Sequence, residues 1–259
     1  MKDDLLILVS NDDGIDAKGL KCLIDVAVEF GEVVVAAPAE AMSGMSHAIT
    51  IKTPLRVKKV YENGKLSKYS CLGTPVDSVK LALNKLLDRR PDIVLSGINH
   101  GSNSSASVVY SGTMAAAMEG CVNQIPSAGF SLLDYDHDAD FSYAKEIVRK
   151  VVSGIIQNGL EKGVCLNVNI PAKPENEIKG IKICRQARGY WKEEFDRRKD
   201  PHNGEYYWLT GQFFNVEPDS EDTDEFALNN DFVSIVPIRI DLTHYESITK
   251  LNNWGLDEN

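Results

Sequence analysis

The chain has 259 residues, of which 43% are hydrophobic, and this is enough for the core of one large α/β domain. Its formal net charge is −10 and its pI is near 5.0, so bulk electrostatics do not attract it to nucleic acid or to an anionic membrane. The five cysteines are scattered, no apolar run is long enough to span a membrane, and no signal peptide is recognisable. We therefore expect a cytoplasmic protein with no nucleic-acid or membrane partner.

The first apolar run, residues 5–9, is short and rich in branched side chains, which is typical of a strand buried on both faces of a parallel sheet. It ends in Asn11, Asp12, Asp13 and Gly14. Open α/β sheets bind their ligands at this end of the strands. Adjacent carboxylates repel each other unless a cation or a proton intervenes, and their oxygens suit Mg²⁺ or Mn²⁺. A polar turn that caps the next helix explains this stretch equally well.

The next segments predict a strand–helix–strand unit. Residues 16–30 have apolar side chains at helical spacing, and residues 33–37 form a second buried strand. The loop that follows, residues 38–47, is rich in small hydroxyl residues and glycine. It leaves the sheet at the same edge as Asp12 and Asp13, so we expect its oxygen atoms or N–H groups to face a ligand.

The middle of the chain predicts smaller elements. Residues 48–53 alternate as a strand does, and residues 55–61 and 66–71 flank an Asn-Gly pair that is typical of a hairpin. Residues 73–87 predict a helix, with Thr74 as its N-cap and a proline at its first position.

Two further polar segments follow. A third parallel-type strand, residues 92–96, continues into a segment that contains Asn99 and Asn103. The sequence Ser-Gly-Thr at 111–113 precedes an alanine-rich helix. The first-turn N–H groups and the dipole of such a helix favour an anion, although ordinary capping with tight helix packing gives the same pattern.

The second half of the chain continues the α/β pattern and then changes character. Further strands and helices are predicted at 126–132, 143–156, 164–170, 178–184, 232–240 and 244–251. Residues 206–214 predict an aromatic-rich hairpin, remote in sequence from the polar loops, which forms either a protein–protein contact or a local mini-core. Residues 218–225 predict a solvated acidic connector.

Five ordered motifs, at 11–14, 43–46, 73–77, 96–103 and 110–113, together resemble the SurE family of survival-protein 5′/3′-nucleotidases. The resemblance extends to the tail at 223–237. It implies a Rossmann-like α/β fold: a mostly parallel sheet with helices on both faces, plus a C-terminal β-hairpin arm and a terminal helix used in oligomerisation. We therefore expect a single domain, 1–259, with a core at 1–189, a protruding arm at 190–231 and a C-terminal strand and helix at 232–259. A homodimer or a homotetramer is implied.

The resemblance also implies the site. One divalent ion per subunit, Mg²⁺ or Mn²⁺, would be held by Asp12, Asp13, Ser43 and Asn99, which together leave water positions open in an octahedral site. The two aspartates are the expected catalytic residues. Substrate and phosphate would be bound by Asn11, Gly44, Ser46, Asn103, Ser111, Gly112 and Thr113.

The implied reaction is hydrolysis of nucleoside 5′-monophosphates, and of 3′-monophosphates as a further option, with Asp12 orienting or deprotonating the attacking water. A covalent aspartyl-phosphate route is the mechanistic alternative. Two other functions stay open: a non-catalytic metal- and nucleotide-binding oligomeric sensor, and a phosphatase acting on polyphosphate or other small phosphoesters. His100 could act as a general acid or contact the substrate, whereas His47 could simply pack or hydrogen-bond.

Overall fold

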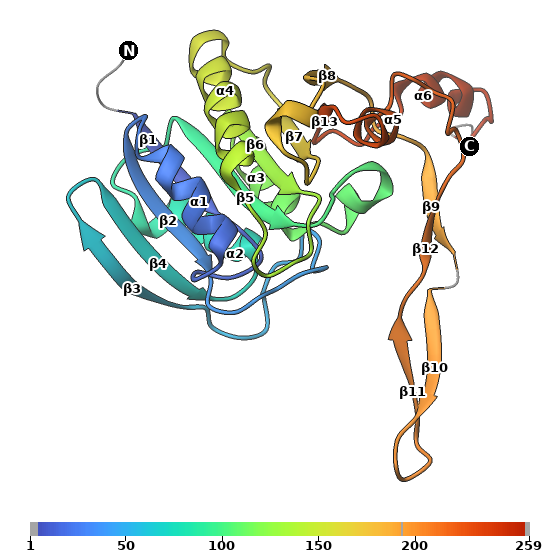
Figure 1. Ribbon diagram of the computed structural model, residues 1–259, viewed down its shortest axis with the longest axis horizontal. Helices are drawn as coiled ribbons and strands as arrows, with labels where there is room; N and C mark the ends of the chain where they lie inside the picture. Colours follow the sequence, from blue (N-terminus) through green and yellow to red (C-terminus); the bar gives the residue numbers. More distant parts are fainter. Residues whose placement is uncertain (1–4, 193, 257–259) are drawn as a thin grey trace.

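A nine-stranded sheet forms the centre of the computed structural model, which describes residues 5–192 and 194–256 (Figure 1). The strand order is β3-β4-β2-β1-β5-β6-β7-β13-β8, and neighbours run parallel except in the pairs β3–β4 and β7–β13. The strands span Leu6–Ser10 (β1), Glu32–Pro38 (β2), Arg56–Asn63 (β3), Leu66–Leu72 (β4), Ile93–His100 (β5), Ser127–Leu132 (β6), Val164–Ile170 (β7), Ile181–Ile183 (β8) and Val233–Arg239 (β13).

Helices cover both faces of this sheet. The helices span Lys18–Ala27 (α1), Pro75–Leu81 (α2), Gly112–Val122 (α3), Ser142–Asn158 (α4), Asp224–Asn229 (α5) and Tyr245–Asn252 (α6), and shorter helical segments span Ala82–Leu86, Ser105–Val109 and Glu175–Glu177. Helix α6 has no buried residue and lies away from the sheet. Within the described residues, no helix combines the length and the apolar character needed to cross a membrane.

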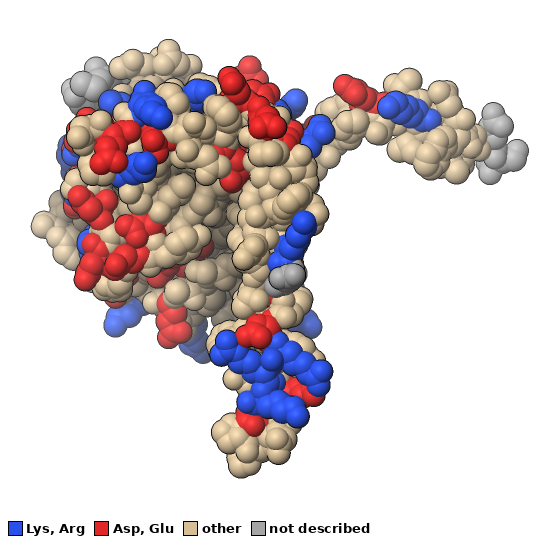
Figure 2. Space-filling view, turned by 45° about the vertical axis from the view of Figure 1, so that its right-hand side comes forward, with Lys and Arg blue, Asp and Glu red and all other residues tan. Residues whose placement is uncertain are grey.

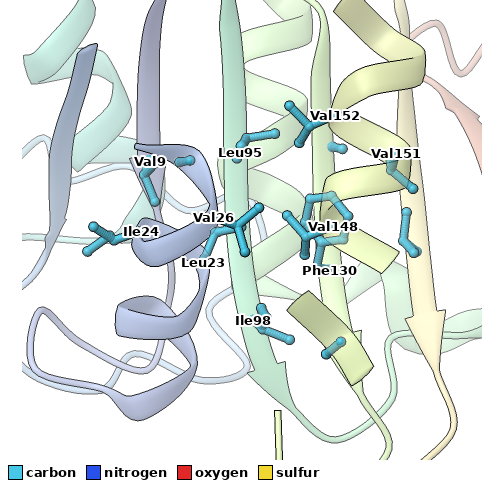
Figure 3. Close-up of a cluster of buried hydrophobic side chains, with 14 of the residues drawn as sticks. Val9, Leu23, Ile24, Val26, Leu95, Ile98, Phe130, Val148, Val151 and Val152 are labelled. Atoms are coloured by element: carbon cyan, nitrogen blue, oxygen red, sulfur yellow. The ribbon is translucent and has the colours of Figure 1, made fainter. Parts of the chain in front are cut away.

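Strand β1 shows why the two faces carry separate cores. Because successive side chains of a strand point to opposite faces, Ile7 and Val9 pack under α1 and α4 in the cluster of Figure 3, whereas Leu6 and Leu8 pack under α2 and α3. All of these side chains are buried. The prediction of a doubly covered, Rossmann-like sheet is therefore confirmed.

The strand predicted at 48–53 is wrong, because this segment is a loop. Its backbone pairs with the N-terminus of α2 instead of with a strand. The Thr74 hydroxyl donates to the Ala48 carbonyl at 2.7 Å, and the Thr50 N–H donates to the Asp77 carboxylate at 3.0 Å. Thr74 is the N-cap of α2, as predicted, and Asp77 completes a capping box with it.

Strand β5 is longer than the predicted 92–96. It runs to His100, and Asn99 pairs in register with Ser131 of β6. Asn99 therefore lies on a strand, where the sheet fixes its position, and not on a loop. The segment predicted at 178–184 keeps only three residues in β8.

The aromatic stretch 206–214 does not fold back on itself as predicted. It is one side of a long two-stranded arm that protrudes from the core (Figure 1), with β11 (Glu205–Leu209) pairing with β10 (Phe195–Lys199) and β12 (Gln212–Asn215) pairing with β9 (Gly189–Lys192). Figure 2 shows Lys and Arg side chains gathered on this arm.

The segment predicted as an acidic connector contains a buried carboxylate. Asp224 is fully buried at the start of α5 and accepts N–H groups of Ser105 at 2.8 Å, Ala187 at 2.9 Å and Glu225 at 2.8 Å. Burial raises the pKa of this carboxyl and the three hydrogen bonds oppose the rise. Asp224 thus ties the chain just before the arm to the segment around Ser105.

Candidate functional site

A cavity of about 540 Å³ lies where polar segments follow the central strands. The residues around it are far apart in the chain, but they follow parallel strands that end at the same edge of the sheet. Among the predicted site residues, those that line it are Asp12, Ser43, Gly44, Asn99, Asn103 and Ser111.

Asp12 is the buried carboxylate of this cavity, with an exposed fraction of 3%. Burial raises its pKa to about 6; the hydrogen bond that the Thr113 hydroxyl donates to its Oδ1 opposes this rise, and the charge of Asp13 adds to it. Burial also raises the pKa of Asp13, against the effect of His100. Two destabilised anions side by side are the environment that a cation stabilises.

The donor set fits a hard divalent cation. The side-chain oxygens Asn11 Oδ1 and Asp13 Oδ2 are buried and have no hydrogen-bond partner among the residues that the structure describes. The Asn99 amide donates its Nδ2 hydrogens to the carbonyls of His100 at 3.1 Å and Gly101 at 2.9 Å, which leaves its oxygen as an acceptor. In the described part of the chain, no three His, Cys, Asp or Glu side chains are grouped to hold a metal, so these two carboxylates would act with neutral oxygens and water, as Mg²⁺ sites do.

Helix α3 begins directly against Asp12. Ser111 is its N-cap and accepts the N–H of Met114 at 3.0 Å. A Cβ atom added to Gly112 would lie 2.7 Å from Asp12 Cβ and 2.9 Å from its Oδ2. Only a glycine therefore allows the first turn of α3 and this carboxylate to approach so closely.

Four predicted phosphate ligands, Asn11, Ser46, Gly112 and Thr113, and the predicted metal ligand Asp13 are not on the cavity lining. Thr113 is fully buried, and its hydroxyl holds Asp12. The Ser46 hydroxyl donates to the Val109 carbonyl at 2.7 Å and its N–H donates to the Tyr110 carbonyl at 3.1 Å. Ser46 thus fastens its loop to the segment before α3.

His47 also attaches the loop at 38–47 to the part of the chain around α3. Its Nε2 lies 3.1 Å from the buried Glu119 carboxylate of α3, and Lys80 binds the other oxygen of that carboxylate at 2.9 Å. His47 therefore hydrogen-bonds in a structural contact, which was one of the two roles considered for it.

Sequence reasoning missed a buried amide network behind the cavity. The backbone N–H of Asn103 donates to the Asn169 side chain at 2.8 Å, its Nδ2 donates to Ser131 at 2.8 Å, and its carbonyl accepts from Asn167 at 2.8 Å. The available signal was the pair of asparagines at alternate positions of the otherwise apolar strand β7, because buried amides require partners.

Sequence reasoning also assigned no arm residue to the site. The cavity is also lined by His100, by Ser107 of the short helical segment Ser105–Val109, by the loop residues Tyr110 and Tyr135, and by the arm residues Trp191, Glu194, Leu209, Thr210 and Gly211. These arm residues therefore complete a wall of the cavity that Asp12 also lines.

The raised pKa of Asp12 predicts a pH effect on stability in the presence of a chelator. In the unfolded chain this carboxyl regains its ordinary pKa of 3.8, so between pH 3.8 and about 6 the unfolded state has lost a proton that the folded state keeps. Stability therefore falls as the pH rises through this range, by about 3 kcal/mol for this group alone. Thermal unfolding of the wild type and of Asp12→Asn between pH 4 and 7 measures it, since contributions common to both proteins cancel. Parallel stability curves would contradict the prediction.

Buried carboxylates and a helix N-terminus at the carboxyl edge of a doubly wound, mostly parallel sheet define a Rossmann-like α/β protein whose pocket suits an anion together with a cation. The family model described as survival protein SurE matches residues 7–193. The chain belongs to the SurE family.

Several relatives resemble the chain over nearly its whole length. A protein of Flavobacterium psychrophilum named 5′-nucleotidase SurE is 53% identical over 254 residues, covering 98% of each chain. A protein of the same name from Flavobacterium johnsoniae is 52% identical over 259 residues, covering 99% of this chain and 100% of its own. The crystal structure of the SurE protein from Aquifex aeolicus is similar with a TM-score of 0.83 at 34% identity, covering 96% of this chain and 98% of that one.

Proposed function

We propose that the protein is a metal-dependent 5′-nucleotidase, which hydrolyses nucleoside 5′-monophosphates to nucleoside and phosphate. The observation that carries this proposal is the position of Asp12, a buried carboxylate of raised pKa against the first turn of α3. Such a carboxylate repels a phosphate unless a cation lies between the two groups. A carboxylate, a cation and a phosphate in contact are the groups that metal-assisted phosphoester hydrolysis requires. The name shared by the relatives supports the same reaction.

Asp12, Asp13, Ser43 and Asn99 would hold the ion, Mg²⁺ or Mn²⁺, which supplies charge neutralisation of the phosphoryl oxygens when bound. Asp12 orients the attacking water and takes its proton. Thr113 fixes the direction of that carboxylate through its hydroxyl. A base held in one orientation is effective because little reorganisation accompanies proton transfer.

The remaining predicted residues, apart from Ser46, bind and orient the phosphate. The N–H groups of the first turn of α3, at 111–113, stabilise the phosphoryl oxygens as their charge develops. Asn103 and Gly44 line the same cavity, and Asn11 offers its unpartnered Oδ1. His100 lines the cavity beside Asp13 and is placed to contact the substrate.

The structure favours water over a covalent aspartyl intermediate. One oxygen of the Asp12 carboxylate, Oδ1, accepts the hydrogen bond of the Thr113 hydroxyl, and this bond lowers the nucleophilicity of the carboxylate toward phosphorus. Net inversion at a chiral phosphate would support attack by water, whereas trapping a phosphorylated Asp12 or Asp13 would overturn it.

A non-catalytic sensor would bind a nucleotide in the same cavity. A protein that only binds phosphate, however, gains nothing from two carboxylates that burial destabilises as anions.

The test is phosphate release from 5′- and 3′-mononucleotides, short polyphosphate and a sugar phosphate, each with Mg²⁺, with Mn²⁺ and with chelator. We expect release from 5′-mononucleotides that chelator abolishes. Tight nucleotide binding without release would establish the sensor, and faster release from polyphosphate would change the substrate class.

The homodimer or homotetramer is likewise proposed. Helix α6 and the residues after it expose large apolar side chains, namely Tyr245, Ile248, Leu251, Trp254 and Leu256, and the arm exposes more. Exposed apolar side chains at this density favour a protein–protein contact, with a second copy of the chain as the partner. The division of the chain into a core at 1–189, an arm at 190–231 and a C-terminal part at 232–259 stays a prediction from the sequence, as does the cytoplasmic location.

A further inference from the structure

The cavity has two chemically different parts. The core contributes oxygen-bearing side chains, among them Asp12, Ser43 and Asn99. The arm contributes an indole, Trp191, and the neighbouring loops contribute the phenol rings of Tyr110 and Tyr135. The proposed phosphate chemistry uses only the first part, so the aromatic part has no role in it.

The indole ring of Trp191 is packed on one side and partly exposed to solvent. It lies on β9 opposite Phe213 of β12, and the two rings meet edge to face with centroids 5.9 Å apart. The residue is nevertheless 39% exposed, so its packing against the arm leaves part of the indole free. An aromatic ring fixed by a cross-strand partner binds a flat ligand with little loss of side-chain entropy.

We propose that Trp191, together with Tyr135, forms a nucleobase subsite in which the base of the substrate stacks while its phosphate lies at Asp12. This inference rests on the proposed nucleotidase function and specifies its substrate class as nucleotides over phosphoesters that lack a base. The cavity volume of about 540 Å³ lies within the usual range for a small-molecule site. Stacking on an aromatic ring tolerates every base, because each base has a π-face.

The charges of the cavity set the direction in which a nucleotide lies. Glu194 lines the part that the arm contributes. Its carboxylate repels a phosphate and accepts hydrogen bonds from the N–H groups of a base edge. A nucleotide therefore binds with its base toward the arm and its phosphate toward the core.

The experiment compares a nucleoside 5′-monophosphate with ribose 5-phosphate, which has the same ester and no base. Trp191→Ala is expected to raise KM for the nucleotide about tenfold or more while kcat changes little, and to leave ribose 5-phosphate kinetics unchanged. Trp191→Phe, which keeps an aromatic face, should restore most of the nucleotide KM. The matched control is Trp208→Ala, because Trp208 is an exposed tryptophan of the same arm that is not on the cavity lining. Equal effects of Trp191→Ala on both substrates, or none on either, would overturn the proposal.

A binding measurement separates this proposal from the proposed function. In a Trp208→Phe/Trp254→Phe protein, Trp191 is the remaining tryptophan, since the chain has three. Its fluorescence should be quenched by the nucleotide and by the free nucleoside, but not by ribose 5-phosphate. If neither substrate is hydrolysed yet this quenching occurs, the nucleotidase function fails and the base subsite stands. If hydrolysis occurs without quenching, the subsite fails alone.

Discussion

Asp12→Asn is expected to lower kcat for phosphate release by about 10³-fold or more at saturating metal, because it removes both a cation ligand and the base that orients water. The substitution keeps the shape of the side chain, and the Thr113 hydroxyl can still donate to the amide oxygen. It also removes a buried charge, so the metal-free variant should be at least as stable as the wild type at pH 7. Phosphate release under saturating nucleotide, together with thermal unfolding, measures both effects.

The matched control is Asp16→Asn, since Asp16 is an exposed carboxylate just after the same turn. It should change the rate by less than about twofold, as surface substitutions away from a site usually have small effects. An Asp12→Asn protein that keeps more than a tenth of the wild-type kcat would exclude Asp12 as the base.

Gly112→Ala is expected to lower kcat/KM by about 10²-fold although it adds only one methyl group. The new Cβ would lie 2.7 Å from Asp12 Cβ, so either the carboxylate or the first turn of α3 must move. A displacement of about 1 Å at a reacting group has an effect of this size on rate. Overpacking a buried site should also reduce the free energy of unfolding by about 1–3 kcal/mol. Steady-state kinetics and denaturant unfolding test the two expectations.

Gly154→Ala is the control for this substitution. Gly154 lies in the interior of helix α4, where an added Cβ would meet no atom within 4 Å. Alanine should therefore raise the free energy of unfolding by about 0.5–1 kcal/mol and leave the rate unchanged. If Gly112→Ala were equally harmless, the close approach of α3 to Asp12 would have no functional importance.

The parts of the fold that sequence predicts well are those in which local and tertiary preferences agree. The run at 5–9 is apolar at every position, which only a strand covered on both faces can accommodate, and β1 is such a strand. Thr74 and Ser111 cap helices in the positions predicted because their side chains satisfy N–H groups a few residues away, within the same segment.

The predictions are wrong or incomplete where contacts between residues far apart in the chain determine the local structure. Residues 48–53 alternate as a strand does, but their backbone partners are the cap residues of α2, which no local pattern reveals. Similarly, no local pattern reveals that the Thr113 hydroxyl donates to Asp12, about a hundred residues earlier in the chain. The contribution of Trp191 to the cavity depends on how the arm leaves the core, and this is set by tertiary contacts such as those of Asp224.

Apart from Tyr135, the residues that line the cavity come from two separate stretches of chain, with Asp12 to Ser111 on one side and Trp191 to Gly211 on the other. Reactivity and selectivity are consequently encoded in different parts of the gene. On the proposed base subsite, a change in the arm is expected to alter how strongly nucleotides are preferred over phosphoesters without a base, while the residues proposed to act on the phosphate stay in place. New substrate preferences can therefore evolve, or be engineered by exchanging residues 189–215 between relatives, at little risk to the underlying chemistry.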